Sequence, residues 1–199
     1  MRFARLSNVA ATLRRPAIVS MSFAVVVSGL LPLDAAQRTP DVERVVATPT
    51  PIRAFKPVKL VIPKIDVKAD VVPVGTHTDG TMGAPPSADS VGWWMGRKAG
   101  KGNVLLDGHH DWNGRIGSFY RLPELDEGDE IRVHGDEEDE VLVYRVVWLK
   151  NFDRNIDATD LLGNKNGQVA TLITCGGEWD SIAGTRRERV VARAELVRT

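Results

Sequence analysis

From position 58 onward, hydrophobic and polar residues alternate in short runs that are separated by glycine and proline. Alternation with a period of two puts successive side chains on opposite faces of a strand, and the β-branched residues in these runs favour strands. The pattern predicts strands over residues 58–62, 69–74, 103–106, 130–133, 141–149, 169–175 and 189–196. Short, evenly spaced strands with turn residues between them are typical of a small closed β-barrel, so we expect an all-β fold.

Helical periodicity is weak along the same part of the chain. The exception is residues 157–162, where Asp157 is a suitable N-cap for one or two helical turns. We therefore expect no more than one or two short helices beside the strands.

The beginning of the chain has a different pattern. Residues 16–33 are eighteen residues without a charge, and four arginines precede them between positions 2 and 15. A helix of this length measures about 27 Å, close to the roughly 30 Å hydrocarbon core of a bilayer. The arginines would keep the N-terminus in the cytoplasm. Residues 1–33 are thus expected to consist of basic cytoplasmic residues followed by a signal-anchor transmembrane helix. A cleaved signal peptide is the alternative.

Residues 34–57 contain four prolines and no sustained period, which is typical of an extended linker. The predicted organisation is therefore an anchor (1–33), a Pro-rich linker (34–57) and one folded domain (58–199), which lies outside the cell and is held to the membrane by a single span.

Charge separates the same segments. Residues 1–57 hold eight basic and three acidic side chains, which leaves 18 basic and 23 acidic side chains for residues 58–199 of the 26 of each sign. A mildly acidic folded domain does not favour nucleic-acid binding.

The chain has a single cysteine, Cys175, which ends the run 169–175 and precedes Gly176 and Gly177. This pattern predicts a strand that stops at a turn, with Ile173 and Cys175 on one face. A lone cysteine is commonly a small buried hydrophobic residue. In an exported chain, however, it cannot form an internal disulfide, and an unused thiol is a liability there, which favours a functional role.

Two further groups lie at predicted strand ends. Upstream of the cysteine, the run 103–106 leads to Asp107-Gly108-His109-His110-Asp111-Trp112; downstream, Arg186-Arg187-Glu188-Arg189 leads into the last strand. The chain order is histidine, cysteine, arginine. Papain-like enzymes place their cysteine before the histidine, so this order argues against them.

The motifs TLITC, GHHDW and RRERVVARAEL, in this order, resemble the sortase family of cysteine transpeptidases over residues 58–197. The Cys-Gly-Gly turn, the Trp93-Trp94 pair and the Gly-His-x-Asp-Trp pattern resemble the class F branch most. The resemblance implies an eight-stranded barrel, an attached membrane anchor and no cofactor.

The resemblance also implies a catalytic set of Cys175 as nucleophile, His109 as proton donor and acceptor, and an arginine for the oxyanion. We favour Arg187 for that role and keep Arg189 as its rival, with Arg186 as a surface charge. His110 would point to the opposite strand face and is expected to be a bystander. A metal site from His109, His110 and Asp111 is a less favoured alternative, because consecutive strand residues diverge.

The candidate substrate-binding residues are Ile173, Asp107 and Trp94. Asp107 departs from the small residue usual in the family two places before the histidine. It either lines the substrate groove or is a surface carboxylate paired with a basic residue. Of the adjacent Trp93 and Trp94, we expect one to lie inside the fold and one outside.

The expected function is cleavage of LPxTG-like sorting-signal peptides of secreted proteins through a thioacyl-enzyme, with transfer to an amine of a cell-wall peptidoglycan precursor. Two alternatives stay open: a hydrolase that releases the same substrates, and a catalytically silent, membrane-tethered barrel that binds wall peptides.

Overall fold

The computed structural model describes residues 52–78, 80–156, 161 and 167–198, which belong to a unit that spans residues 47–199. The predicted anchor (1–33), most of the predicted linker and all but one residue of the predicted helix at 157–162 lie outside the described residues. Within the described part of the chain, no helix is both long and apolar enough to cross a bilayer.

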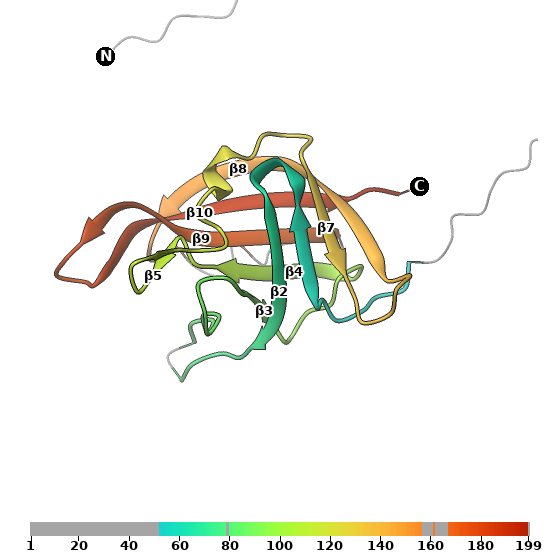
Figure 1. Ribbon diagram of the computed structural model, residues 1–199, viewed down its shortest axis with the longest axis horizontal. Helices are drawn as coiled ribbons and strands as arrows, with labels where there is room; N and C mark the ends of the chain where they lie inside the picture. The colour runs from blue at the N-terminus through green and yellow to red at the C-terminus, as the bar shows by residue number, and fades with distance from the viewer. Residues whose placement is uncertain (1–51, 79, 157–160, 162–166, 199) are drawn as a thin grey trace, which may run out of the picture. The chain divides into compact units, whose positions relative to one another are not determined.

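Eight strands close into a barrel (Figure 1), as the sequence predicts. Around the barrel they are β1 (Lys59–Ile62), β2 (Val67–Val74), β3 (Val91–Trp94), β4 (Gly102–Gly108), β9 (Gln168–Asp180), β10 (Thr185–Leu196), β8 (Val141–Asp153) and β7 (Glu130–His134), which pairs with β1. Two neighbouring pairs, β2–β3 and β4–β9, are parallel, and the others are antiparallel.

Three short elements accompany the barrel. Two are 3-10 helices, η1 (Pro63–Ile65) and η2 (Leu122–Glu124), and the third is a small hairpin of β5 (Asp111–Trp112) and β6 (Arg115–Ile116). The sequence pattern misses this hairpin and strand β3. Both are very short, and β3 contains Gly92 and follows a proline-containing loop, so neither carries a sustained alternation of polar and hydrophobic residues.

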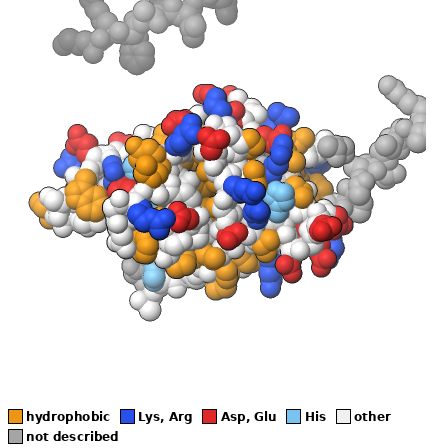
Figure 2. Space-filling model, viewed as in Figure 1, with side chains coloured by type: hydrophobic (Ala, Val, Ile, Leu, Met, Phe, Trp, Pro, Cys, Tyr) orange, Lys and Arg blue, Asp and Glu red, His pale blue; other side chains and the backbone are white. Residues whose placement is uncertain are grey.

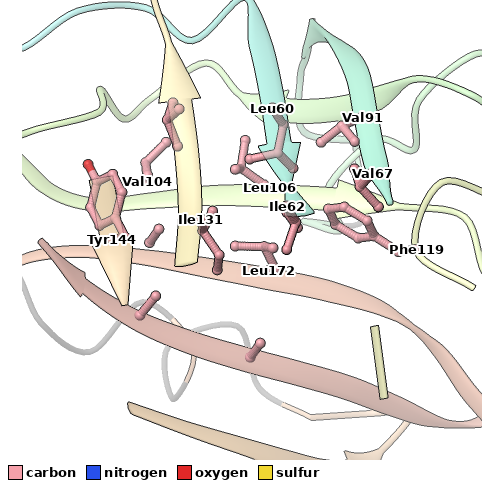
Figure 3. Packing of buried hydrophobic residues seen from close by; sticks show 14 of the residues in the cluster. Leu60, Ile62, Val67, Val91, Val104, Leu106, Phe119, Ile131, Tyr144 and Leu172 are labelled. Carbon is pink, nitrogen blue, oxygen red and sulfur yellow. The ribbon is translucent and has the colours of Figure 1, made fainter. Parts of the chain in front are cut away.

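The barrel interior is filled by alternate residues of each strand (Figure 3), and many of these side chains have no exposed surface. On the three strands that matter most for function, the inward-facing set is even-numbered: Val104 and Leu106 on β4, Ala170 and Leu172 on β9, and Val190, Ala192 and Ala194 on β10. Because strand side chains alternate, the odd-numbered residues of these strands lie on the outer face of the barrel.

Strands β9 and β10 continue beyond the barrel as a projecting two-stranded hairpin (Figure 1). The prediction that the cysteine strand stops at Cys175 is therefore wrong, because β9 runs through both glycines to Asp180. Gly177 adopts a φ of 70°, which most side chains disfavour, and the pairing register shifts on β10 near this point. Hydrophobic side chains gather at the end of the projection (Figure 2), where Trp179 is 57% and Ile182 98% exposed.

Candidate active site

The floor of the candidate site is the outer face of β4, β9 and β10. Asp107 on β4 lies opposite Ile173 on β9, and Cys175 on β9 lies opposite Arg189 on β10. All four are odd-numbered neighbours of inward-facing residues, so their side chains share the outer face. The predicted shared face of Ile173 and Cys175 is thus confirmed.

Parallel pairing places His109 and Cys175 just beyond the same end of the β4–β9 ladder. The β4–β9 ladder ends at the pair Asp107 and Ile173. His109 comes two residues after Asp107, and Cys175 comes two residues after Ile173. In a parallel pair, equal advances along the two strands lead to the same edge. A histidine and a cysteine far apart in the sequence are therefore brought to one edge of the barrel.

Several contacts hold His109, which follows the last residue of β4. Its Nε2 lies 2.9 Å from the carbonyl oxygen of Pro85, and its ring stacks on Trp112 with centroids 5.5 Å apart. A carbonyl oxygen only accepts hydrogen bonds, so Nε2 is the donor and carries the proton in the neutral ring. The carbonyl of His109 also accepts a hydrogen bond from the amide of Phe119. A Cβ atom at Gly117 would overlap that carbonyl, so only glycine fits there.

Cys175 is half-buried, has a free thiol, and lies directly beside an arginine in the β9–β10 ladder. Residues directly opposite each other in an antiparallel pair have Cβ atoms about 4.5–5.5 Å apart. That arginine is Arg189, whose Nη1 donates hydrogen bonds to the carbonyl oxygens of Arg186 and Glu188. These bonds hold the guanidinium against the β10 backbone, on the side of the projecting hairpin.

Arg187, which the sequence-based prediction favours, has a different environment. Its side chain is 61% exposed and lies 3.6 Å from Glu178 and 4.0 Å from Asp180. It falls at the register shift between Arg186 and Glu188, so it has no paired residue on β9. Register therefore favours Arg189 over Arg187 as the arginine beside the thiol.

Arg186 is more than the surface charge that the sequence suggests. Its Nε donates to Asp111 Oδ1 over 2.9 Å, and its Nη1 donates to the carbonyl oxygen of Gly177 over 2.8 Å. His110 is likewise engaged: it lies in the loop after β4, and its Nδ1 is 2.7 Å from the same Asp111 oxygen. Sequence reasoning misses this cluster, although Asp111 is part of the Gly-His-x-Asp-Trp pattern.

Within the described residues, no group of three or more His, Cys, Asp or Glu side chains is arranged to hold a metal ion.

Asp107 is partly buried on the floor of the site, not a surface carboxylate. Burial raises the pKa of Asp107 to about 7, against the opposing effects of the Arg189 charge and of a hydrogen bond from the Gly108 amide. The carboxylate thus changes charge near neutral pH, close to the arginine that neighbours Cys175.

Trp94 is the predicted site residue that lies away from the histidine end of the site. Strand β3 runs antiparallel to β4 with Val91 opposite Gly108, so Trp94 lies three residues, about 10 Å, away from the histidine end. Its indole donates a hydrogen bond to Thr76, and Arg97 lies over its ring. Trp93 is buried in the core, so the expectation of one tryptophan inside and one outside is confirmed.

The sortase-domain family model matches residues 60–197, most of the chain. This chain is a member of the sortase family. Sortases are cysteine transpeptidases, so the protein is an enzyme of that class. No curated protein sequence matches it.

Solved sortase structures share the fold. Sortase A of Listeria monocytogenes is 24% identical and superposes with a TM-score of 0.53, covering 71% of this chain and 88% of its own. Sortase C-1 of Actinomyces oris is 24% identical, with a TM-score of 0.54 and 75% of each chain covered. Sortase D5 of Clostridium perfringens is 21% identical, with a TM-score of 0.51 and coverages of 71% and 79%.

Proposed function

We propose that this sortase is a membrane-anchored, extracytoplasmic transpeptidase in which Cys175 is the nucleophile and His109 exchanges the protons. The observation that carries the assignment is the parallel β4–β9 register, which brings the only cysteine and a restrained histidine to one edge of the barrel. Assignment to the class F branch rests on the sequence motifs alone, and anchoring rests on the apolar segment 16–33.

In the first half-reaction, Cys175 Sγ attacks the carbonyl carbon of the scissile peptide bond and forms a thioester. The bond to the leaving amine breaks, and His109 gives that nitrogen a proton. An imidazolium has protons on both nitrogens, so the ring can give up one proton from Nδ1 while Nε2 stays bonded to the Pro85 carbonyl. In the second half-reaction, an acceptor amine attacks the thioester carbon and forms an amide, the C–S bond breaks so that Cys175 leaves as the thiolate, and His109 takes the proton of the amine.

Arg189 is the proposed oxyanion donor, because it is paired with Cys175 across the ladder and shares its face. A guanidinium stays charged throughout and offers several N–H donors, which suits the negative charge that develops on the carbonyl oxygen. Ile173 and Asp107 form the adjoining floor, over which the substrate peptide would lie.

The proposed substrates are LPxTG-like sorting signals of secreted proteins, and the proposed acceptor is an amine of a peptidoglycan precursor. Both follow from family membership. A hydrolase would use the same intermediate and differ only in accepting water. A silent binding barrel is disfavoured by the half-buried position of Cys175 beside an arginine, since an inert structural cysteine is usually fully buried among apolar groups.

The test is incubation of the full-length protein, in detergent, with a peptide containing LPETG, with and without glycine or a diaminopimelate-type amine. We expect cleavage in both cases, an amine-exchanged product when amine is present, and no product with Cys175→Ala. Cleavage without exchange would indicate a hydrolase, and cleavage by Cys175→Ala would refute the assignment of the nucleophile.

A further inference from the structure

The backbone ladder that brings His109 and Cys175 together stops short of both residues. The last β4–β9 pair is Asp107 and Ile173, β4 ends at Gly108, and the chain then turns into the β5–β6 hairpin. Beyond this point, no β4–β9 ladder pair joins the two segments directly.

Two hydrogen bonds span this gap, and a third lies within the His109 loop. Asp111 Oδ1 lies 2.7 Å from His110 Nδ1 and accepts a bond from Arg186 Nε at 2.9 Å, while Arg186 Nη1 donates to the Gly177 carbonyl at 2.8 Å. Asp111 is two residues after His109, and Gly177 is two residues after Cys175. The contacts therefore join the loop that carries the histidine to the strand segment that carries the cysteine. In Figure 1, β5 lies beside the base of the β9–β10 hairpin, where this ion pair forms.

The chemistry of these groups suits a rigid link. Hydrogen bonds between ionised partners are shorter and roughly twice as strong as neutral ones, and the planar guanidinium fixes two donors in one geometry. The Arg186 side chain is 24% exposed and the Asp111 side chain 44% exposed, so water screens the pair only partly. Consistently, the hydrogen bond from Arg186 is the largest factor that lowers the pKa of Asp111.

We infer that Asp111 and Arg186 are positioning residues that hold the His109 loop against the Cys175 strand in the geometry that proton transfer requires. The inference rests on the proposed roles of His109 and Cys175. A displacement of about 1 Å between reacting groups can lower a rate by roughly a hundredfold, so a small change in this link affects the chemical step. Peptide binding over Ile173 and Asp107 involves neither residue and changes little.

The experiment compares Arg186→Gln, Arg186→Lys and Asp111→Asn with Arg115→Gln as the control and with His109→Gln as the reference for loss of the imidazole, all in the full-length protein. Arg115 is the matched control: it belongs to the same hairpin and forms an ion pair of 2.8 Å with Asp89, but that pair does not join the His109 loop to β9. Three quantities are measured for each variant: kcat and KM with the LPETG peptide, the pH dependence of Cys175 alkylation by iodoacetamide, and the melting temperature.

We expect Arg186→Gln and Asp111→Asn to lower kcat by about 10- to 100-fold with KM changed less than about threefold. Arg186→Lys should show a smaller loss of kcat than Arg186→Gln. Its ammonium keeps the charge but lacks the planar fork with which the guanidinium reaches both Asp111 and the Gly177 carbonyl. The kcat of Arg115→Gln stays within about twofold of that of the wild type. The alkylation profile of Arg186→Gln shifts toward that of His109→Gln, a change that a loss of stability alone does not produce.

Three results overturn the inference in distinguishable ways. If His109→Gln changes the alkylation profile and kcat but Arg186→Gln changes neither, the ion pair has no positioning role and the proposed catalytic pair stands. If His109→Gln leaves both unchanged, the proposed pairing of His109 with Cys175 fails, and the bridge fails with it. Equal losses in Arg186→Gln and Arg115→Gln would also exclude a specific bridge.

Discussion

The Asp107 carboxylate lies on the outer barrel face, next to Ile173 in the ladder and near the charge of Arg189. The sequence shows that this residue is acidic where the family has a small residue, but it does not show how far the carboxylate is buried. A groove residue and a surface carboxylate give the same sequence pattern, and only the packing of neighbouring segments decides whether water reaches the group. Partial burial raises its pKa to about 7, so this residue carries a measurable signature.

That signature predicts a pH-dependent effect of Asp107→Asn on stability. The unfolded aspartate ionises near pH 4 and the folded one near pH 7, so between these values the unfolded state releases a proton that the folded state keeps. The ionisation of Asp107 therefore lowers the stability of the wild type as the pH rises from about 4 to 7. An asparagine at this position does not ionise. The free energy of unfolding of Asp107→Asn, relative to that of the wild type, should therefore increase across this range by up to about 4 kcal/mol.

Denaturant unfolding at pH 4.5 and pH 8 measures the difference. Asp70→Asn, at an exposed position on β2, is the control and should show no such increase. A stability difference for Asp107→Asn that is constant between the two pH values would mean that the carboxylate is not desolvated.

At the scale of elements, the sequence predicts most of the barrel because seven strands carry clear alternation with turn residues between them. The projecting β9–β10 hairpin could not be predicted in the same way. Two consecutive glycines normally end a strand, and here they continue it, because Gly177 adopts a positive φ within a ladder whose register shifts on β10. That shift also decides which arginine faces the cysteine, and residue spacing alone cannot locate it.

The register makes a direct prediction about the two candidate arginines. Arg189→Ala should lower kcat/KM by at least about a hundredfold, because it removes the donor opposite Cys175. Arg187→Ala should lower it by less than about fivefold, since its side chain is exposed and lies near Glu178 and Asp180. Steady-state cleavage of the LPETG peptide by both variants provides the comparison. The reverse order of effects would restore Arg187 to the role and would mean that the ladder pairing does not identify the functional arginine.

At the scale of the whole molecule, the closed barrel explains how a histidine, a cysteine and an arginine that are far apart in the sequence come to lie on neighbouring strands. Parallel pairing of β4 with β9 and antiparallel pairing of β9 with β10 bring the three strands into one outer surface. The chain order of these residues, together with their motifs, was enough to predict the family; the roles of His109 and Cys175 stay predictions. The side-chain bridge from Asp111 to Gly177 was not predictable, because it depends on where the hairpin after β4 folds back.

The most direct test of the account is the intact mass of the full-length protein, in detergent, after brief incubation with the LPETG peptide in the absence of amine. We predict an added mass equal to the acyl portion of the cleaved peptide, located on Cys175 by fragmentation, labile to hydroxylamine and absent in Cys175→Ala. Cleavage of the peptide without any such adduct, or an adduct on a residue other than Cys175, would contradict the central claim.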